Sequence, residues 1–277
     1  MSIKHKRTEA VSTIKELMNL TGRRALITGA AGGIGKVMAD TLAELGADLV
    51  LVDRPESDFE TLCATLTERW GINIEHYCCD LEFQEQRKEL IGWLQSGGKG
   101  LNILINNAAF VGTSDLQGWA VPFDEQTVDT WRRALEVNLT AIFELCQGLT
   151  PLLKIADGAS IINIASIYGM YGPDWSLYED TSMSNPAAYG ASKGGLIQLT
   201  TWLATTIAPQ VRVNAISPGG VFRNQPEIFV KRYEASVPMK RMATEDDFRG
   251  AVAYLSSDLS NYVNGQNLLV DGGRGIW

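Results

Sequence analysis

Short, almost continuous apolar runs alternate along the chain with segments whose apolar residues recur at helical spacing. The runs are too short for helices and lack the alternation of half-exposed strands, so they predict strands that are buried on both faces. We expect seven of them, at 24–28, 48–53, 74–79, 101–106, 160–165, 212–216 and 268–270. Helices are expected between them, at 34–45, 59–70, 84–94, 127–153, 186–208 and 245–255.

Strands that are separated by helices usually form right-handed units in which neighbouring strands run parallel. The pattern therefore predicts an α/β fold with a doubly wound parallel sheet of about seven strands and helices on both faces. No linker or internal repeat divides the chain, so residues 20–277 are expected to form a single domain. An N-terminal extension at 1–19 is expected to carry a short helix over 8–19, because apolar residues have helical spacing at Val11, Ile14, Leu17 and Met18.

Charge and composition exclude several functions. The 277 residues carry a net charge of −8, which would repel a phosphate backbone, so nucleic acid is not expected as a partner. The basic N-terminus is not followed by an apolar run, so we expect no signal peptide, no membrane span and a cytoplasmic location. No metal site is expected, because only two histidines are present and metal-ligand spacing is absent from Cys63, Cys78, Cys79 and Cys146.

A glycine-rich turn, with the sequence TGAAGGIG over 28–35, links the first predicted strand to the first predicted helix. The diphosphate of a dinucleotide needs backbone N–H groups at a helix N-terminus, with no side chains in the way. Glycine permits both the tight turn and the close approach. We therefore expect this turn to bind the cofactor through Gly29, Gly33, Ile34 and Gly35.

The end of the second predicted strand favours NAD over NADP. Asp53 stands there, where a carboxylate can accept hydrogen bonds from the adenosine ribose hydroxyls and repel a 2′-phosphate. Arg54 could instead meet a 2′-phosphate, but the glycine turn itself contains no basic residue. NAD is thus the expected cofactor, and NADP is the second choice.

Two further strand ends are expected to lie near the adenosine. Asp80 follows the third strand, where it either caps the next helix or accepts a hydrogen bond from the adenine amino group. In the second case Leu81 would pack on the base. Asn106 and Ala108, at the end of the fourth strand, are small enough to let the chain pass close to the adenosine.

Tyr189 and Lys193 are candidates for proton transfer. They are four residues apart in a predicted helix and share one face, and none of the other seven tyrosines has a lysine at this spacing. Positive charge from the lysine and an oxidised nicotinamide would lower the pKa of the phenol, so that Tyr189 could take a proton from an alcohol. Ser166 follows a strand and could hydrogen-bond the substrate oxygen. Asn138 interrupts a long helix, either as a surface residue or to hold a water that connects Lys193 to solvent.

These motifs together resemble those of the short-chain dehydrogenase/reductase family over roughly residues 20–274. The resemblance rests on TGAAGGIG, Asp53, Asp80-Leu81, NNAA at 106–109, Asn138, Ser166, YGASK at 189–193, Pro218-Gly219 and VDGG at 270–273. It implies a single Rossmann-type domain, an Asn–Ser–Tyr–Lys tetrad and further cofactor contacts at Pro218, Gly219 and Val221. It also implies a homotetramer or homodimer in which helices 127–153 and 186–208 form subunit contacts.

Two departures from the family pattern concern the site. The segment after Pro218-Gly219 usually offers a threonine to the nicotinamide amide, but Arg223 stands there and Asn224 is the alternative anchor. The chain between Ser166 and Tyr189 is also longer than is usual in the family, and the extra residues form a loop at 168–185.

The loop at 168–185 and the segment 220–238 are expected to flank the substrate and set specificity. Arg223 suits a carboxylate or phosphate, and the first loop offers aromatic faces beside polar groups at Tyr168, Met170, Tyr171, Asp174, Trp175, Tyr178, Glu179 and Asp180. These features favour a sugar- or polyol-type alcohol or ketone; otherwise the aromatics only pack the loop. Both segments resemble dehydrogenases found among bacterial genes for surface sugars, including nonulosonic acids.

Two other functions stay open at this point. A 3-oxoacyl-thioester reductase would share the fold but would normally prefer NADPH and a basic surface, against which Asp53 and the negative charge argue. A non-catalytic NAD-binding regulatory protein would be expected to lack part of the tetrad, and all four residues are present.

Overall fold

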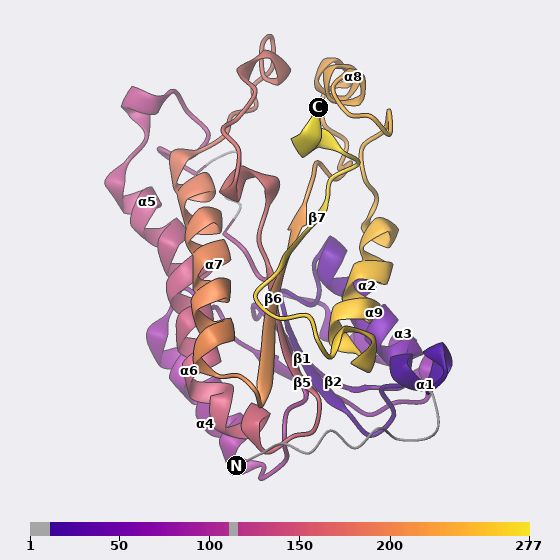
Figure 1. The fold of residues 1–277 in the computed structure, drawn as a ribbon. Coiled ribbons are helices and arrows are strands. Elements are labelled where there is room, and N and C mark those ends of the chain that lie inside the picture. Colours follow the sequence, from indigo (N-terminus) through magenta and orange to yellow (C-terminus); the bar gives the residue numbers. More distant parts are fainter. Residues whose placement is uncertain (1–11, 111–115) are drawn as a thin grey trace.

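Seven parallel strands form one sheet in the computed structural model, which describes residues 12–110 and 116–277. The strands lie in the order β3-β2-β1-β4-β5-β6-β7 (Figure 1). The predicted α/β fold is confirmed, and each strand lies within two residues of its predicted position. The bounds are Arg24–Thr28 for β1, Asp48–Asp53 for β2, Ile74–Cys78 for β3, Ile103–Asn106 for β4, Ala159–Ile164 for β5, Val211–Pro218 for β6 and Asn267–Val270 for β7.

Helices cover both faces of this sheet. Figure 1 shows α4, α5, α6 and α7 on one side and α2, α3 and α9 on the other, with α8 beyond one end of the strands. Within the described ranges, no helix is long and apolar enough to cross a membrane. The bounds are Ile14–Met18 for α1, Gly33–Glu44 for α2, Phe59–Trp70 for α3, Gln84–Ser96 for α4, Val128–Leu135 for α5, Ala141–Lys154 for α6, Ala187–Thr206 for α7, Glu227–Ala235 for α8 and Arg249–Ser256 for α9.

The sheet carries a separate apolar core on each face. Successive side chains of a strand point to opposite faces, so Leu26 packs with residues of α4, α6 and α7, whereas Ile27 packs with residues of α2 and α9. The side chains of Leu26 and Ile27 are both fully buried. The strands β1, β2, β4 and β5 are buried on both faces, so their sequences are almost continuously apolar and they could be predicted closely. The edge strands β3 and β7 are partly exposed.

The strand order reverses between β1 and β4. The chain first builds β1, β2 and β3 outward in one direction, then crosses back and adds β4 to β7 on the other side of β1. Open α/β sheets bind ligands in the crevice at the carboxyl ends of the strands where this reversal occurs. The glycine turn follows β1, so it lies at that crevice.

The helix predicted over 127–153 is interrupted. Between α5 and α6 the chain forms a π-helical turn, Glu136–Thr140, with Asn138 at its centre. Asn138 is fully buried, and its Oδ1 accepts a 2.6 Å hydrogen bond from the Phe110 N–H. A π turn admits one extra residue into the helix, and here it places a polar side chain opposite the chain end that follows β4. Helical periodicity alone could not predict this break.

The helix predicted over 8–19 is shorter in the described part of the chain. It is the single turn α1, which begins after a capping box formed by Thr13 and Glu16. Asn19 ends it with extended backbone, and Leu20 then enters the core. Val11 lies outside the described residues.

A buried arginine braces the π turn. Arg87 of α4 is 1% exposed, and its guanidinium contacts Glu136 of the π turn and Glu144 of α6, each at 2.6 Å. It also donates a 2.6 Å hydrogen bond to the Leu81 carbonyl oxygen. One side chain thus fixes α4, the π turn and the start of α6 relative to each other.

Replacement of this arginine should destabilise the fold strongly. In Arg87→Met the two glutamates lose their partner, and breaking a largely buried ion pair costs about 3 kcal/mol. We therefore expect the free energy of unfolding, measured by urea denaturation, to fall by about that amount. Lys88→Met is the matched control, because Lys88 is 53% exposed and pairs with Glu85, which is exposed as well. Equal stability of the two variants would contradict the bracing role.

Candidate active site

Hydrogen bonds lock the glycine turn to the end of β4. The Thr28 hydroxyl accepts from the backbone N–H groups of Asn107 at 3.0 Å and Ala108 at 3.1 Å. The Asn107 side-chain amide in turn donates to the carbonyl oxygens of Thr28 and Gly29, both at 3.0 Å. Gly29 has φ +64°, and a Cβ there would lie 2.8 Å from the Ala108 Cα. Only glycine fits at this position, and the predicted Gly29 and Ala108 are brought together.

The N-terminus of α2 suits a diphosphate. The first N–H groups of any helix lack intrahelical partners, and here they belong to Gly33, Ile34 and Gly35. The N-cap residue, Gly32, has no side chain that could accept from them. A Cβ on Gly35 would lie 2.0 Å from the Gly29 carbonyl oxygen, so the turn has room for hydrogen only. Free N–H groups at a helix N-terminus attract anions. The predicted glycines therefore fit the diphosphate of NAD or NADP.

Asp53 is held beside this turn. Its carboxylate accepts hydrogen bonds from the backbone N–H groups of Ala31 and Arg54, both at 2.8 Å. The Arg54 guanidinium pairs instead with Glu56 at 3.0 Å, and both of these side chains are more than 60% exposed. The carboxylate is thus fixed at the carboxyl end of β2, whereas the neighbouring arginine is directed to its own loop.

Three predicted adenosine contacts have other roles in the structure. The Asp80 carboxylate accepts from the Glu82 N–H at 2.9 Å, so it closes a turn, while Phe83 is the N-cap of α4. Leu81 is 5% exposed and packs in the core. The Asn106 side chain is buried and donates to Asn163 Oδ1 at 2.8 Å. Side chains of Leu81 and Asn106 therefore point inward, because the two strand ends are covered by α4 and α6.

Ser166 and Tyr189 meet at the carboxyl end of β5. Ser166 follows the strand by two residues and is 6% exposed, and its hydroxyl accepts from the Tyr168 N–H at 3.2 Å. Tyr189 lies in the first turn of α7 and hydrogen-bonds the Ser166 side chain. A serine and a tyrosine hydroxyl thus converge, as the tetrad requires.

Lys193 lies one helical turn below Tyr189. It is 1% exposed, its Nζ donates a 2.7 Å hydrogen bond to the Ile164 carbonyl oxygen, and this nitrogen is 5.8 Å from the centre of the Tyr189 ring. Burial lowers the pKa of Lys193 to about 8, because the charged form is desolvated.

The pKa of Tyr189 differs in direction from the expectation. Burial raises it, the nearby Tyr178 raises it further, and the hydrogen bond with Ser166 acts in the opposite direction. Lys193 Nζ instead donates to the Ile164 carbonyl oxygen. The protein's own groups therefore keep Tyr189 protonated at neutral pH.

Asn138 is a buried positioning residue and not a surface residue. Its Oδ1 accepts from the Phe110 N–H at 2.6 Å, and its Nδ2 donates to the Phe110 carbonyl oxygen at 3.3 Å and to Ser192 Oγ at 3.1 Å. Ser192 lies beside Lys193 in α7 and also bonds the Tyr189 carbonyl oxygen at 2.8 Å. The amide thus contacts protein groups and ties the chain end that follows β4 to α7. The water that would connect Lys193 to solvent through Asn138 stays a prediction.

The segment after β6 follows the expected path but directs Arg223 elsewhere. Pro218 ends β6, the Gly219 N–H donates to the Val270 carbonyl oxygen at 2.9 Å, and Val221 pairs with Ala243. A Cβ on Gly33 would lie 2.6 Å from a guanidinium nitrogen of Arg223. The arginine therefore lies against the glycine turn. Asn224 is exposed and has φ +58°.

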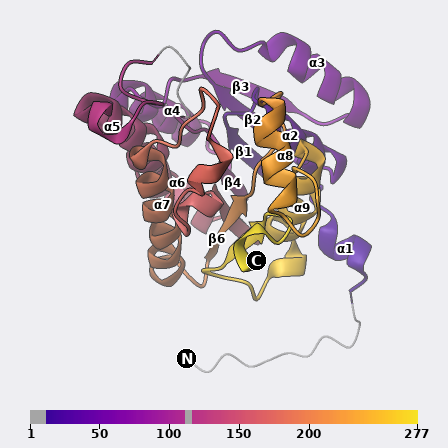
Figure 2. The ribbon, with the colours of Figure 1, turned by 90° about the horizontal axis from the view of Figure 1, so that it is seen from above.

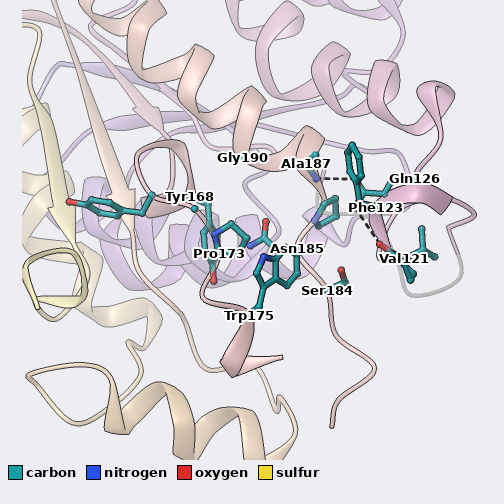
Figure 3. Close-up of a pocket in the computed structure, with 14 residues that line it drawn as sticks. Val121, Phe123, Gln126, Tyr168, Pro173, Trp175, Ser184, Asn185, Ala187 and Gly190 are labelled. Carbon is teal, nitrogen blue, oxygen red and sulfur yellow. Dashed lines mark hydrogen bonds between the residues drawn. The ribbon is translucent and has the colours of Figure 1, made fainter. Parts of the chain in front are cut away.

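A cavity of about 440 Å³ lies between the loop at 168–185, the segment 121–126 and the first turn of α7. Figure 3 shows Trp175, Pro173 and Asn185 on one side of it and Phe123 and Gln126 on the other. Gln126 Oε1 accepts from the Ala187 N–H at 3.1 Å, which joins the second wall to the helix that carries Tyr189. The other lining residues include Val121, Pro122, Tyr168, Tyr171, Gly172, Ser184, Pro186 and Gly190.

A polar cluster that the sequence did not single out lies beside Tyr189. The hydroxyl groups of Tyr168 and Tyr178 are 2.7 Å apart, and Asn185 Nδ2 donates to the Tyr178 hydroxyl at 3.2 Å. Burial raises the pKa of Tyr168, so its hydroxyl stays neutral at physiological pH. The aromatic residues of the loop had been noted, but which of them reach Tyr189 depends on how the loop folds back.

Ion pairs hold this loop from two distant segments. Arg274, near the C-terminus, pairs with Asp174 at 2.7 Å and donates to the Ser236 carbonyl oxygen at 3.1 Å. Arg232 of α8 pairs with Asp180 at 3.1 Å. In the view from above, the C-terminal turn lies next to α8 (Figure 2). The loop, α8 and the C-terminal residues therefore form one assembly at the carboxyl ends of the strands.

Sequence comparison points to one family. The family model described as enoyl-(acyl carrier protein) reductase matches residues 29–274. Nodulation protein G from Rhizobium sp. (strain N33) is 35% identical over 93% of this chain and 98% of its own length.

Solved structures agree with this assignment. A short-chain dehydrogenase from Leptospira borgpetersenii with bound NAD⁺ has a TM-score of 0.81 and 32% identity, covering 98% of this chain and 99% of that one. A gluconate 5-dehydrogenase from Burkholderia cenocepacia J2315, in complex with NADP and tartrate, has a TM-score of 0.80 and 30% identity, covering 94% and 98%. The chain therefore belongs to the short-chain dehydrogenase/reductase family, and it is an NAD(P)-dependent oxidoreductase that acts on CH–OH groups.

Proposed function

We propose that this protein is an NAD-dependent dehydrogenase/reductase that interconverts an alcohol and a ketone on a polar sugar- or polyol-type substrate. The observation that carries the proposal is the convergence of Ser166 and Tyr189 at the end of β5, with Lys193 buried one helical turn below. Asn138 fixes the helix that carries the last two residues. The glycine turn lies two strands away, at the end of β1.

The tetrad residues would divide the proton chemistry between them. A bound nicotinamide supplies the hydride acceptor or donor. The Ser166 hydroxyl holds the substrate oxygen, and Tyr189 takes its proton in alcohol oxidation or returns one in ketone reduction. Because protein groups raise the pKa of Tyr189, its conversion to a phenolate needs positive charge nearby.

Lys193 would supply part of this charge. Its pKa of about 8 means that a modest change in surroundings decides whether the ammonium is charged or neutral near physiological pH. Its Nζ donates to the carbonyl oxygen of Ile164, the last residue of β5, and lies over the Tyr189 ring. When it is charged, the lysine would therefore favour the phenolate form of Tyr189.

The walls of the cavity support a hydroxylated substrate. Asn185 and Gln126 line the cavity and provide amides between aromatic side chains, and the Tyr178 hydroxyl, which accepts from Asn185 Nδ2, lies next to them. Neutral donors and acceptors beside aromatic faces suit polyols and sugars. The gluconate 5-dehydrogenase relative supports the same substrate class. A 3-oxoacyl-thioester substrate is the alternative, because the description of the family model names a reductase of a different acyl thioester, an enoyl-(acyl carrier protein).

Asp53 supports NAD as the cofactor. Two backbone N–H groups hold its carboxylate at the carboxyl end of β2, where it would accept from the ribose hydroxyls and repel a 2′-phosphate. Arg54 is paired with Glu56 and does not offset this charge. Relatives with bound NAD⁺ and with NADP both exist, so the choice rests on these residues.

Activity with NAD⁺ and a panel of polyols, sugars, sugar acids and a 3-hydroxyacyl thioester, followed by NADH absorbance, tests the proposal. We expect turnover of a polyol or sugar derivative. Tyr189→Phe should lower kcat/KM by about 10²–10⁴-fold, because the proton-transfer group is lost, while NADH binding, measured by fluorescence, stays unchanged.

Tyr262→Phe is the control for this substitution, because Tyr262 is fully exposed and should tolerate the change. Full activity of Tyr189→Phe would refute the mechanism. Turnover of the thioester alone would move the acyl reductase to first place.

Asp53→Asn should relax the cofactor preference. The amide can still accept from the Ala31 N–H, but it no longer repels a 2′-phosphate. We expect the ratio of kcat/KM for NAD⁺ to that for NADP⁺ to fall by about tenfold, equivalent to about 1.4 kcal/mol. Asp48→Asn, at the opposite end of β2, is the control and should leave the ratio unchanged. A wild-type preference for NADP⁺ would show that NAD is the wrong cofactor.

The buried lysine should give a distinctive dependence of stability on pH. Its pKa is lowered from 10.5 to about 8, so between these values the unfolded chain binds more protons than the folded one. Stability from this group therefore rises with pH across that window. We expect Lys193→Met to be stabilised relative to wild type at pH 7, and this gain to shrink by pH 10, as measured by urea unfolding.

The control here is Lys154→Met, at the exposed end of α6, which should show a constant difference from wild type over the same range. A constant difference for Lys193→Met as well would mean that folding does not perturb the lysine.

A further inference from the structure

A cation from a distant segment lies at the N-terminus of α2. A Cβ built on Gly33 would be 2.6 Å and 2.7 Å from the two terminal guanidinium nitrogens of Arg223, and 2.8 Å from Oε1 of Glu245. Arg223 and Glu245 form an ion pair of 3.2 Å. Both charged groups therefore rest on the glycine turn, although neither belongs to it.

The backbone around Arg223 is fixed by several hydrogen bonds. The Phe222 N–H donates to the Ala243 carbonyl oxygen at 2.9 Å, and Val221 pairs with Ala243. The Arg223 N–H donates to Gln225 Oε1 at 2.7 Å, and Gln225 Nε2 donates to the Val221 carbonyl oxygen at 2.8 Å. The segment 221–225 is thus docked on 243–245, which delivers the arginine to α2. The Arg223 side chain itself is about half exposed, so its guanidinium is accessible to a ligand.

We propose that Arg223 binds the diphosphate of the dinucleotide and that Glu245 holds this arginine at the glycine turn until the diphosphate replaces the carboxylate. The inference rests on the proposed NAD-dependent function. It assigns Arg223 to the cofactor and not to a carboxylate of the substrate, the role that its sequence position had suggested.

The chemistry of the turn supports this assignment. The turn itself contains no basic residue, so its attraction for a diphosphate would otherwise come only from N–H groups and the helix dipole. A guanidinium can form two parallel hydrogen bonds with phosphate oxygens. Glu245 lies at the same helix N-terminus as an internal anion. Its carboxylate and the diphosphate compete for the same partners, so the carboxylate must withdraw when the diphosphate binds.

Equilibrium binding tests the role of Arg223 independently of turnover. We would measure Kd for NADH by fluorescence, and for ADP-ribose and adenosine by displacement. Arg223→Met should weaken NADH and ADP-ribose by about tenfold, because one charge-assisted contact is lost, and leave adenosine, which has no phosphate, within about twofold. Arg223→Lys should restore part of the affinity, since it keeps the charge without the paired hydrogen bonds.

Glu245→Gln gives the opposite expectation. The amide no longer competes as an anion, so NADH and ADP-ribose should bind severalfold more tightly, with adenosine unchanged. Lys231→Met and Glu227→Gln are the charge-matched controls, because this exposed pair lies in α8. Neither should alter any of the three Kd values.

The outcomes separate the two proposals. If wild type binds NADH but Arg223→Met binds all three ligands as wild type does, the assignment of Arg223 is overturned and the proposed function stands. An equal loss for adenosine would also overturn it, since that pattern indicates a distorted site. Failure of wild type to bind NADH would overturn both proposals.

Discussion

The close approach of two strand ends, β1 and β4, is the constraint on which the site depends. Thr28 and Asn107 satisfy each other's backbone and side-chain groups across the gap, and Gly29 leaves no space between the chains. The contact lies at the reversal of strand order, where the crevice is, and it directs the N-terminus of α2 toward that crevice. The end of β5, where Ser166 follows, lies next to β4 and is held by the same sheet. The same strand ends thus organise cofactor binding and proton transfer.

Two polar side chains of the helices that cover the sheet are buried, which costs free energy unless hydrogen bonds replace the lost water. Lys193 and Asn138 are almost fully buried, yet each has backbone partners, at Ile164 and Phe110. Leaving either residue without a partner would be expensive. The π turn is the backbone adjustment that lets Asn138 reach Phe110, so local irregularity and catalytic geometry have the same origin.

The sheet and most helices could be predicted because burial shapes the sequence: strands buried on both faces are continuous apolar runs, as around Leu26 and Ile161, and helices show apolar residues at helical spacing. The position of Tyr189 and Lys193 on one helix could be predicted from their spacing. The direction of single side chains could not: Leu81 and Asn106 turn inward, and Arg223 crosses to the glycine turn, because contacts with distant segments decide it. The homotetramer or homodimer stays a prediction.

The ion pair between Asp174 and Arg274 has a consequence for how such a chain can diverge. The two residues are far apart in sequence, yet one holds the inserted loop and the other lies in the C-terminal turn. A relative with a different loop at this position would leave Arg274 without its partner, and a relative with a changed C-terminus would leave Asp174 without its partner. A change of specificity in this fold therefore involves both the loop at 168–185 and the C-terminal turn. Moving the loop alone into another family member would leave out the residue that holds it.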